Sequence, residues 1–281
     1  MKFNICTYAF IFSLLNLFFT GCSEDTTPYP EKEIYFEVEY PANALLIEEY
    51  ASMHNETSPA WLVKTYEYDE YKRLIKTYVP MQSENGEISG IYGYTLYKYD
   101  TNGLLIKEEE YACTNPSDSV LTLNAIYDYI YLSGKLQTKR CTNYSGGPHS
   151  HIQYTYEKDL LVKEEQYFEN KLTFYMTYEY DSNKKLISIK TYNPVNNNAF
   201  FAWCSYSEYE YENSLIASKK NYNVFNEATL SATSTEMYYY DSNANLILIK
   251  TNVHTPKDNH FPMPTVIPNK RWFVYEQTEI S

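Results

Sequence analysis

Glycine is scarce in this chain, with 8 glycines among 281 residues. So few glycines argue against collagen-like repeats, glycine-rich phosphate-binding loops and disordered glycine-rich segments. The chain also lacks a segment that sustains the 3.6-residue apolar period of an amphipathic helix. Positive charge is in short supply as well, since the formal net charge is −13. Because an acidic chain is repelled by phosphate backbones, we expect no nucleic-acid partner.

Tyrosine, in contrast, is abundant: the chain has 33 tyrosines, and aromatic residues make up 17% of it. Tyrosine favours strands, where its ring packs on a half-buried pleated surface. Many of the tyrosines belong to a repeat in which a tyrosine precedes a short polar turn and a Leu-containing segment, as in "YDTNGLLIK" from Tyr99 and "YDSNKKLIS" from Tyr180. The eight copies start at Tyr40, Tyr68, Tyr99, Tyr131, Tyr156, Tyr180, Tyr211 and Tyr240.

Each copy has the pattern of a β-hairpin. Seven of these anchor tyrosines follow a second tyrosine two residues earlier, as Tyr99 follows Tyr97. Because side chains alternate along a strand, both rings point to one face, while the mostly polar residues between them point to the other. In the turn, the Asp after the tyrosine can accept hydrogen bonds from the downstream backbone, and Asn tolerates a left-handed φ.

These hairpins predict the fold class. Two strands per repeat give an all-β, up-and-down antiparallel meander of about sixteen strands. Fourteen tyrosines on one face are too many to leave in water, since burial of each ring is worth roughly 2–3 kcal/mol. We therefore predict that the sheet curls into a barrel or a tight spiral with the rings inside, which also removes the exposed edge strands.

The N-terminus has the pattern of a secretory signal. Lys2 precedes an apolar run, and Thr20-Gly21 precedes Cys22. The run is too short for a spanning helix. The small residues before Cys22 resemble the lipobox of bacterial lipoproteins, which implies cleavage before Cys22 and acylation of this residue. We expect a signal peptide over residues 1–21, an acidic tether over 22–33 and one β-repeat domain over 34–281.

The repeat resembles known families. "YTLYKYDTNGLLIKEEEY", residues 94–111, is similar to the YD repeats of bacterial RHS-type shells. Together with the lipobox, it resembles Bacteroidota lipoproteins of unknown function that have a porin-like fold. The resemblance covers roughly residues 34–281 and implies a fold without an activity. The Ser-Glu-Asp that follows Cys22 resembles a surface-export signal, so the implied location is the outer membrane, exposed at the cell surface.

Sites with recognisable chemistry are scarce. Cys113 and Cys141 occupy matching points of consecutive repeats. Such points lie about 10 Å apart, beyond the reach of a disulfide, so no bridge between them is expected. His149 and His151 lack a third local ligand, so no metal is predicted. The carboxylate runs 108–110 and 164–165 are interpreted as solvated strand edges. No nucleophile elbow or phosphate loop is present, and neither catalytic residues nor a cofactor are predicted.

Three functional hypotheses remain open. The first is a non-catalytic binding or structural module, which a lipid at Cys22 attaches to the membrane, with a glycan or another envelope protein as its partner. In this hypothesis Trp61, Trp203 and Trp272 could stack on sugar rings; the alternative is that they fill the core. The second is an envelope enzyme, a glycan-directed hydrolase with its site in the barrel mouth. The third is an outer-membrane pore or transport accessory.

Overall fold

A computed structural model describes residues 40–52, 60–83, 86–113, 120–143, 149–195, 200–226, 229–254 and 270–275. The chain divides into two units, Met1–Lys32 and Glu33–Ser281, and every described residue belongs to the second unit. The predicted signal peptide, the tether and Cys22 lie outside the described residues. The predicted division at residues 21 and 33 therefore stays a prediction.

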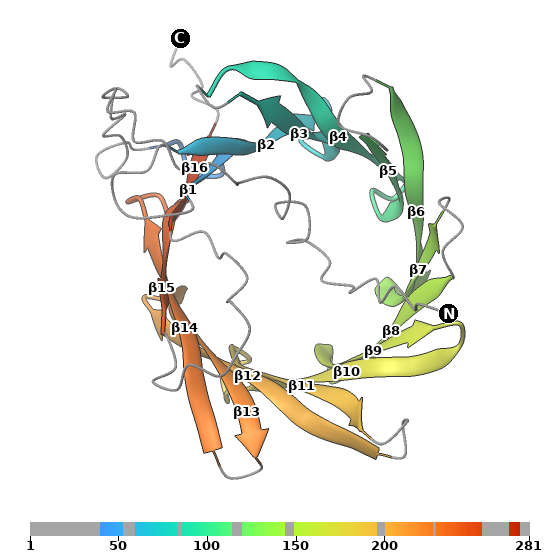
Figure 1. The fold of residues 1–281 in the computed structure, drawn as a ribbon, viewed down its shortest axis with the longest axis vertical. Helices are drawn as coiled ribbons and strands as arrows, with labels where there is room; N and C mark the ends of the chain where they lie inside the picture. The colour runs from blue at the N-terminus through green and yellow to red at the C-terminus, as the bar shows by residue number, and fades with distance from the viewer. Residues whose placement is uncertain are drawn as a thin grey trace. The chain divides into compact units, whose positions relative to one another are not determined.

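Sixteen antiparallel strands form a closed barrel (Figure 1). Each strand pairs with its neighbours in the sequence, and β1 pairs with β16 to close the sheet. The prediction of an all-β meander that closes on itself is thus confirmed. The strands are β1 (Leu46–Ser52), β2 (Trp61–Tyr68), β3 (Leu74–Gln82), β4 (Ile88–Tyr99), β5 (Leu105–Cys113), β6 (Leu121–Leu132), β7 (Lys135–Asn143), β8 (Ser150–Glu157), β9 (Leu160–Phe168), β10 (Lys171–Tyr180), β11 (Leu186–Val195), β12 (Phe200–Glu212), β13 (Leu215–Asn226), β14 (Thr229–Tyr240), β15 (Leu246–Val253) and β16 (Lys270–Tyr275).

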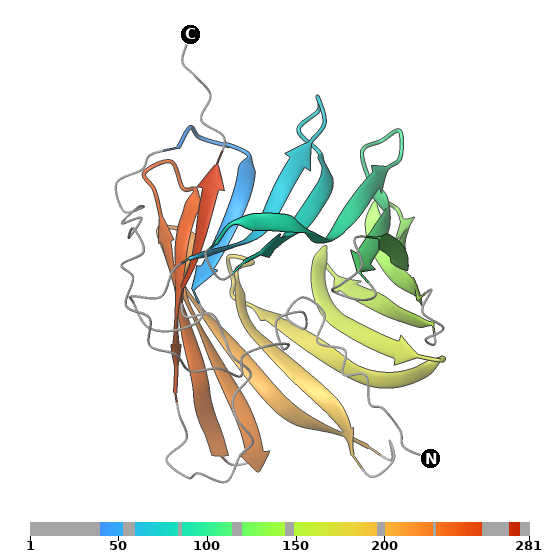
Figure 2. The same cartoon turned by 45° about the horizontal axis from the view of Figure 1, so that its top comes forward.

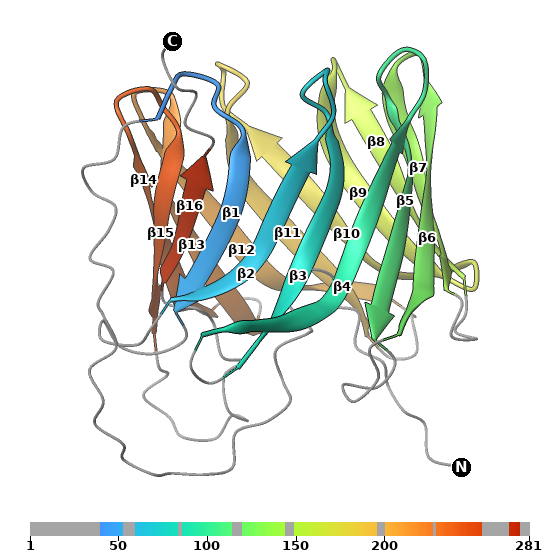
Figure 3. The ribbon, with the colours of Figure 1, turned by 90° about the horizontal axis from the view of Figure 1, so that it is seen from above.

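The short turns of the repeat lie together at one end of the barrel, which we call the hairpin rim (Figures 2 and 3). It contains the turns that join β2 to β3, β4 to β5 and so on to β14–β15. Four of these turns begin with the Asp that follows an anchor tyrosine. In the first, Asp69 Oδ1 accepts hydrogen bonds from the backbone N–H groups of Tyr71 and Arg73, both at 2.9 Å. Asp100, Asp181 and Asp241 repeat this arrangement.

The left-handed residue of these four turns is not the predicted Asn. It is the third residue after the Asp, with φ of 60° at Lys72, 81° at Gly103, 65° at Lys184 and 65° at Ala244. Three of the four turns therefore place a residue with a Cβ where glycine is least strained. Three other turns at this rim have two central residues, both with positive φ, which is the geometry of type I′ hairpins. They are centred on Ser133–Gly134, Lys158–Asp159 and Asn213–Ser214.

A β-bulge accompanies the anchor tyrosine in every one of these hairpins. In β2 and β3, for example, Glu67 is opposite Lys76 but Tyr68 is opposite Leu74, so Ile75 is the extra residue. Register shifts of the same kind occur at Tyr99, Tyr131, Tyr156, Tyr180, Tyr211 and Tyr240. Because a bulge increases the local twist, seven bulges at one level help to curve the sheet into a barrel.

The anchor hydroxyls connect most hairpins to the one before. The ladder between β3 and β4 begins only at Lys76, so the Leu74 carbonyl at the rim is left outside it. The Tyr99 hydroxyl donates to this carbonyl at 2.8 Å. The equivalent donors and carbonyls are Tyr68 to Leu46, Tyr131 to Leu105, Tyr180 to Leu161, Tyr211 to Leu186 and Tyr275 to Leu246, at 2.8–2.9 Å. Tyr240 forms the matching hydrogen bond with the backbone of Ile216.

The first anchor, Tyr40, continues this series across the closure of the barrel. Its ring centroid lies 5.1 Å from that of Tyr275, and its hydroxyl is hydrogen bonded to the Tyr275 backbone. The Tyr40 backbone is held by the β14–β15 turn, where its N–H donates to Asp241 and its carbonyl accepts from Asn243. The chain therefore enters the barrel at the hairpin rim, beside β15 and β16.

Removal of one anchor hydroxyl measures what this bond contributes. We expect Tyr180→Phe to lower the free energy of unfolding by about 1 kcal/mol, because the Leu161 carbonyl loses its donor while the ring is kept. Chemical denaturation with matched m-values gives the difference. The control is Tyr78→Phe on the outer wall, where a change within about 0.5 kcal/mol is expected. Equal losses of unfolding free energy in the two variants would contradict the assigned hydrogen bond from Tyr180 to the Leu161 carbonyl.

The turn conformations give a reciprocal prediction. Ala244→Gly should raise the free energy of unfolding by up to about 1 kcal/mol, because it relieves a left-handed alanine, and Gly103→Ala should lower it by a similar amount. Denaturant titrations of both variants check this. Ala232→Gly, in the strand β14, serves as the control and should destabilise the barrel. If Ala244→Gly behaves like Ala232→Gly, the conformation of the turn is not as described.

Candidate functional site: the inner wall

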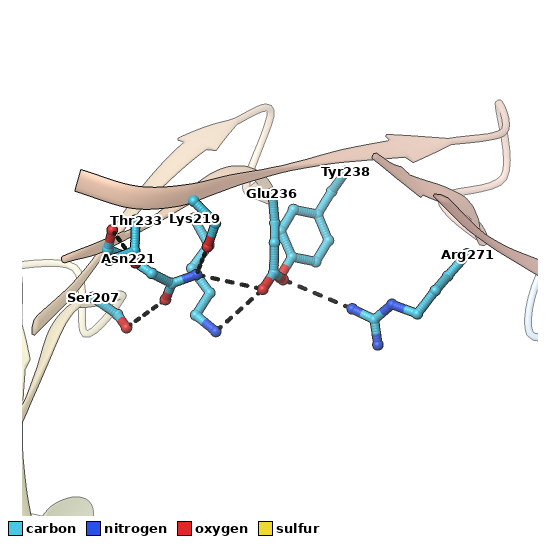
Figure 4. A network of polar contacts seen from close by, with 8 residues as sticks. Ser207, Lys219, Asn221, Thr233, Glu236, Tyr238 and Arg271 are labelled. Atoms are coloured by element: carbon cyan, nitrogen blue, oxygen red, sulfur yellow. Dashed lines mark hydrogen bonds and ion pairs between the residues drawn. The ribbon is translucent and has the colours of Figure 1, made fainter. Parts of the chain in front are cut away.

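The two faces of the barrel wall differ in composition. Figure 4 shows Lys219, Glu236, Tyr238 and Arg271 projecting from the concave side of the sheet, which makes this face the inner wall. The strand registers extend this face to the tyrosine pairs of all the other hairpins. Sixteen-stranded barrels are wide enough to enclose a lumen. The inner wall is therefore the candidate site.

In four of the seven pairs the second tyrosine also reaches the preceding hairpin. Glu108 of β5 is opposite Tyr97 of its own hairpin. In the next hairpin it is opposite Tyr127, which is two residues before the equivalent tyrosine, Tyr129. The Tyr129 hydroxyl then donates diagonally to Glu108, at 2.6 Å. Equivalent pairs are Tyr66 with Glu49 at 2.9 Å, Tyr97 with Thr77 at 3.4 Å, and Tyr178 with Glu164. Tyr238 differs, since it donates to Glu236 of its own strand at 2.7 Å.

Three of the carboxylates were not predicted as part of a site. Glu108, Glu110 and Glu164 lie on the inner wall and accept hydrogen bonds from tyrosine hydroxyls. The interpretation of both carboxylate runs as solvated strand edges is wrong for these residues. Glu109 and Glu165 pair with Lys98 and Lys163 on the outer wall, and their side chains are only 14% and 20% exposed. The two-residue period of a strand predicts that Glu108 and Glu110 share a face. It does not show whether that face is the inner or the outer one.

Burial controls the protonation of this wall. Burial raises the pKa of the Glu164 carboxyl, and the hydrogen bond from Tyr178 offsets only part of this effect. The pKa of the Tyr129 hydroxyl is also raised, first by burial and then by the neighbouring Glu108. The tyrosines thus stay neutral and act as hydrogen-bond donors. The charge of the Glu164 carboxylate is therefore only partly compensated by its surroundings.

Ion pairs occur at two places on the described part of the inner wall. Lys139 lies 3.2 Å from Glu108 and 4.5 and 4.8 Å from the ring centroids of Tyr127 and Tyr129, within the range of cation–π contacts. This lysine is thereby held between an acid and two rings. The same region contains Cys141, a free thiol whose pKa is raised by burial.

The second cationic place surrounds Glu236 (Figure 4). Lys219 Nζ lies 3.6 Å from Glu236 Oε1, and an Arg271 guanidinium nitrogen lies 3.8 Å from Oε2. Asn221 donates to Glu236 at 3.5 Å and accepts from the Ser207 hydroxyl at 2.8 Å. We call Lys219, Glu236 and Arg271 the two-cation cluster. It extends over four neighbouring strands, β13 to β16.

The outer wall contains charged pairs along its strands. Lys190 pairs with Glu179, and Lys220 with Glu210 at 2.7 Å. Further pairs are Lys98 with Glu109, Lys107 with Asp128 and Lys163 with Glu165. The expectation that one face is aromatic and the other wet is thus too simple, because the outer wall also has tyrosines. Tyr78, Tyr94 and Tyr111 form a row across three strands, with centroids 6.4 and 4.6 Å apart.

The structure does not bring the three predicted tryptophans together. Trp61 begins β2, and Trp272 is opposite Tyr50 and Leu248 in β16. Trp203 lies in β12, four strands from β16, and thus about 19 Å away along the wall. A shared stacking site is therefore not formed by these residues, and the role of each one alone stays a prediction.

The histidines and cysteines add no metal-binding geometry. His151 stacks on Tyr167 with centroids 4.7 Å apart, and burial lowers the pKa of its imidazole. Within the described residues, no three His, Cys, Asp or Glu side chains are placed to hold a metal ion. Cys141 and Cys204 are free thiols.

No helix among the described residues is long and apolar enough to cross a membrane.

Glu164→Gln tests the electrostatics of the inner wall. A carboxyl whose pKa is raised by folding stabilises the fold below its unfolded pKa, and this stability is lost as the pH rises through the folded pKa. The Gln variant keeps an acceptor for Tyr178 without the charge. We expect its melting temperature to exceed that of the wild type at pH 7–8 and to approach it near pH 4. Glu165→Gln, on the outer wall, is the control; a pH-independent difference for Glu164→Gln would contradict this account.

Comparisons with known proteins agree with the architecture. No protein-family model matches the chain, and no curated protein matches it. Among solved structures, a porin-like protein from Bacteroides uniformis has a TM-score of 0.51 at 12% identity, over 84% of this chain and 98% of that one. A porin-like protein from Bacteroides vulgatus matches with a TM-score of 0.35 at 10% identity, over 83% of this chain and 99% of that one. The first likeness shows that the chain shares the porin-like β-barrel fold.

Proposed function

We propose that the protein is a non-catalytic β-barrel of the cell envelope, anchored by a lipid at Cys22, that binds a ligand on its inner wall. The observation that carries this proposal is the row of Lys–Glu and Lys–Asp pairs on the outer wall. A wall that faces lipid needs an aliphatic band, and charges at the middle of a bilayer cost about 2–4 kcal/mol each. A water-facing wall tolerates them.

A barrel with a water-facing wall needs another attachment to the membrane. Cys22 supplies it in this proposal, because acylation by more than one chain gives stable anchoring. Residue 40 is held at the hairpin rim by Asp241 and Asn243. The eighteen residues from Cys22 to Tyr40 span at most about 60 Å when extended. This attachment favours an orientation in which the hairpin rim faces the membrane.

The inner wall supports a binding role better than a purely structural one. It combines half-buried aromatic rings with carboxylates, amides and cations, such as Tyr238, Asn221 and Lys219. Small-molecule sites typically combine an apolar or aromatic lining with a few fixed polar groups. A wall that served only to close the barrel would have no need of the charged residues in the two-cation cluster.

An outer-membrane pore is the second candidate function, favoured by the likeness to a porin-like protein. The two candidates differ in what holds the protein in the membrane. A pore is held by its outer wall, whereas the anchored barrel is held by Cys22 alone.

Fractionation of a Cys22→Ser variant separates the two candidates. In a Bacteroidota host, we expect the wild-type chain to take up a fatty-acid label and to sediment with the membranes. The variant should lose the label and move to the soluble fraction. Cys113→Ser is the matched control and should behave as the wild type. Retention of the unlabelled variant in membranes after a carbonate wash would favour the pore.

A further inference from the structure

One arrangement recurs on the inner wall, in which the second tyrosine of a pair donates to a glutamate of the preceding hairpin. We call each such pair a tyrosine–carboxylate frame. The three frames are Tyr66 with Glu49, Tyr129 with Glu108, and Tyr178 with Glu164. They differ in the residue that stands beside the glutamate.

A lysine of the chain completes the frame of Glu108. It is Lys139, which is directly opposite Tyr129 on the return strand β7. Its Nζ lies 3.2 Å from Glu108 Oε2 and 4.8 Å from the centroid of the Tyr129 ring. The frame of Glu49 also has a lysine at hand, because Lys64 is directly opposite Glu49 on β2. The Glu108 frame thus shows how this arrangement accommodates an ammonium group.

The frame of Glu164 has no such lysine. Tyr178 is opposite Ile189, which occupies the position that Lys139 has in the other frame. On β10, Met176 is directly opposite Glu164, so the neighbour on that side is a thioether. The frame therefore has a carboxylate, a tyrosine hydroxyl and two apolar side chains, and neither of these two side chains supplies a positive charge.

Within the described residues, Glu164 takes part in no ion pair. Its neighbour in the strand, Lys163, faces the outer wall and pairs with Glu165 at 2.7 Å. Lys139 is two strands away, and its ammonium group lies at Glu108. Burial raises the pKa of the Glu164 carboxyl, and one tyrosine hydrogen bond acts against this effect. A cation that entered the frame would therefore stabilise the charged carboxylate.

Two further carboxylates on the inner wall have more partners. Glu110 accepts hydrogen bonds from Asn124 at 3.0 Å and from Tyr127 at 3.3 Å. Glu236 lies 3.6 Å from the Lys219 ammonium group. Both carboxylates therefore have support that the third frame lacks.

The side chains around Glu164 indicate which kind of cation fits. The Tyr178 ring corresponds to the Tyr129 ring, which lies within cation–π range of an ammonium group. Ile189 and Met176 suit an alkyl chain better than a hydrated ion. Calcium and magnesium ions need about six oxygen ligands, and no cluster of three His, Cys, Asp or Glu exists within the described residues. An alkylammonium ion uses both the carboxylate and the apolar side chains.

We propose that the inner wall at Glu164 binds the ammonium group of a linear alkylamine, such as a diamine or polyamine, in the place that Lys139 takes beside Glu108. This inference rests on the proposed binding function and names its ligand class. The ammonium group donates to Glu164 and lies against the Tyr178 ring, while the alkyl chain packs on Ile189. The net charge of −13 also attracts polycations to the chain.

Calorimetric titration of the full chain in detergent tests this site. The probes are cadaverine, spermidine, neutral 1,5-pentanediol and potassium chloride. We expect one amine per chain, bound more tightly than the diol or potassium, with an affinity that falls as salt is raised. Glu164→Gln keeps an acceptor for Tyr178 without the charge and should weaken amine binding about tenfold or more. Glu110→Gln and Glu165→Gln are the matched controls and should stay within about twofold of the wild type.

Two exchanges between the frames separate a specific site from general attraction to an acidic chain. Ile189→Lys places a lysine beside Glu164, so it should abolish cadaverine binding and raise the melting temperature at pH 7. Lys139→Ile removes the lysine from the Glu108 frame, so it should raise the stoichiometry from one amine per chain to two. Ile189→Met, which adds no charge, is the control and should bind as the wild type does.

The outcomes are distinct. Absence of binding of both amines, or equal cadaverine binding by the wild type and Glu164→Gln, overturns the site. An unchanged stoichiometry in folded Lys139→Ile overturns the equivalence of the frames, and this variant decides the matter if Ile189→Lys does not fold. Equal binding of pentanediol overturns the ammonium assignment, although a binding function of the inner wall would survive. The Cys22→Ser fractionation is independent of every probe, so failure of the lipid-anchored barrel is recognised separately.

Discussion

The structure depends on one repeated interaction, a tyrosine hydroxyl that donates to a backbone carbonyl of the preceding hairpin. The carbonyl, for instance that of Leu74, lies beyond the end of the β-ladder and would otherwise lack a protein donor at the rim. The bulge opposite the anchor lies on the return strand, where it increases the local twist. Most hairpins thereby depend on the one before, and Tyr40 carries the series across the closure to Tyr275.

The same two-residue step organises the inner wall. Because both tyrosines of a pair lean toward the preceding hairpin, the residue found there decides what the second hydroxyl meets. At Glu108 and Glu164 it meets a carboxylate, which closes the wall. For Tyr209 the register places Ile189 at this position, whose side chain offers no acceptor. The residue at this position therefore differs among the hairpins, since it is Lys139 for Tyr154 and Lys219 for Tyr238.

The sequence alone predicts much of this barrel. The tyrosine pairs, such as Tyr97 and Tyr99, show the strand period, the shared face and the need for closure, and the Asp that begins four of the turns indicates the hydrogen bonds there. The site is less predictable, because it depends on which residues of the strand after the turn face inward. The bulge at Ile106 shifts that phase, so counting from the turn does not show whether Glu108 faces inward. The diagonal partners depend in turn on the register between hairpins, which no local pattern encodes.

Simultaneous removal of the anchor hydroxyls tests the central claim most directly. A variant with Tyr→Phe at positions 68, 99, 131, 180, 211 and 275 keeps every ring and removes six donors to backbone carbonyls. These sites lie about 10 Å apart, so their effects should add to roughly 6 kcal/mol of lost unfolding free energy in a denaturant titration. A loss per hydroxyl no larger than that of an outer-wall set at positions 78, 94, 111, 167 and 192 would contradict the account.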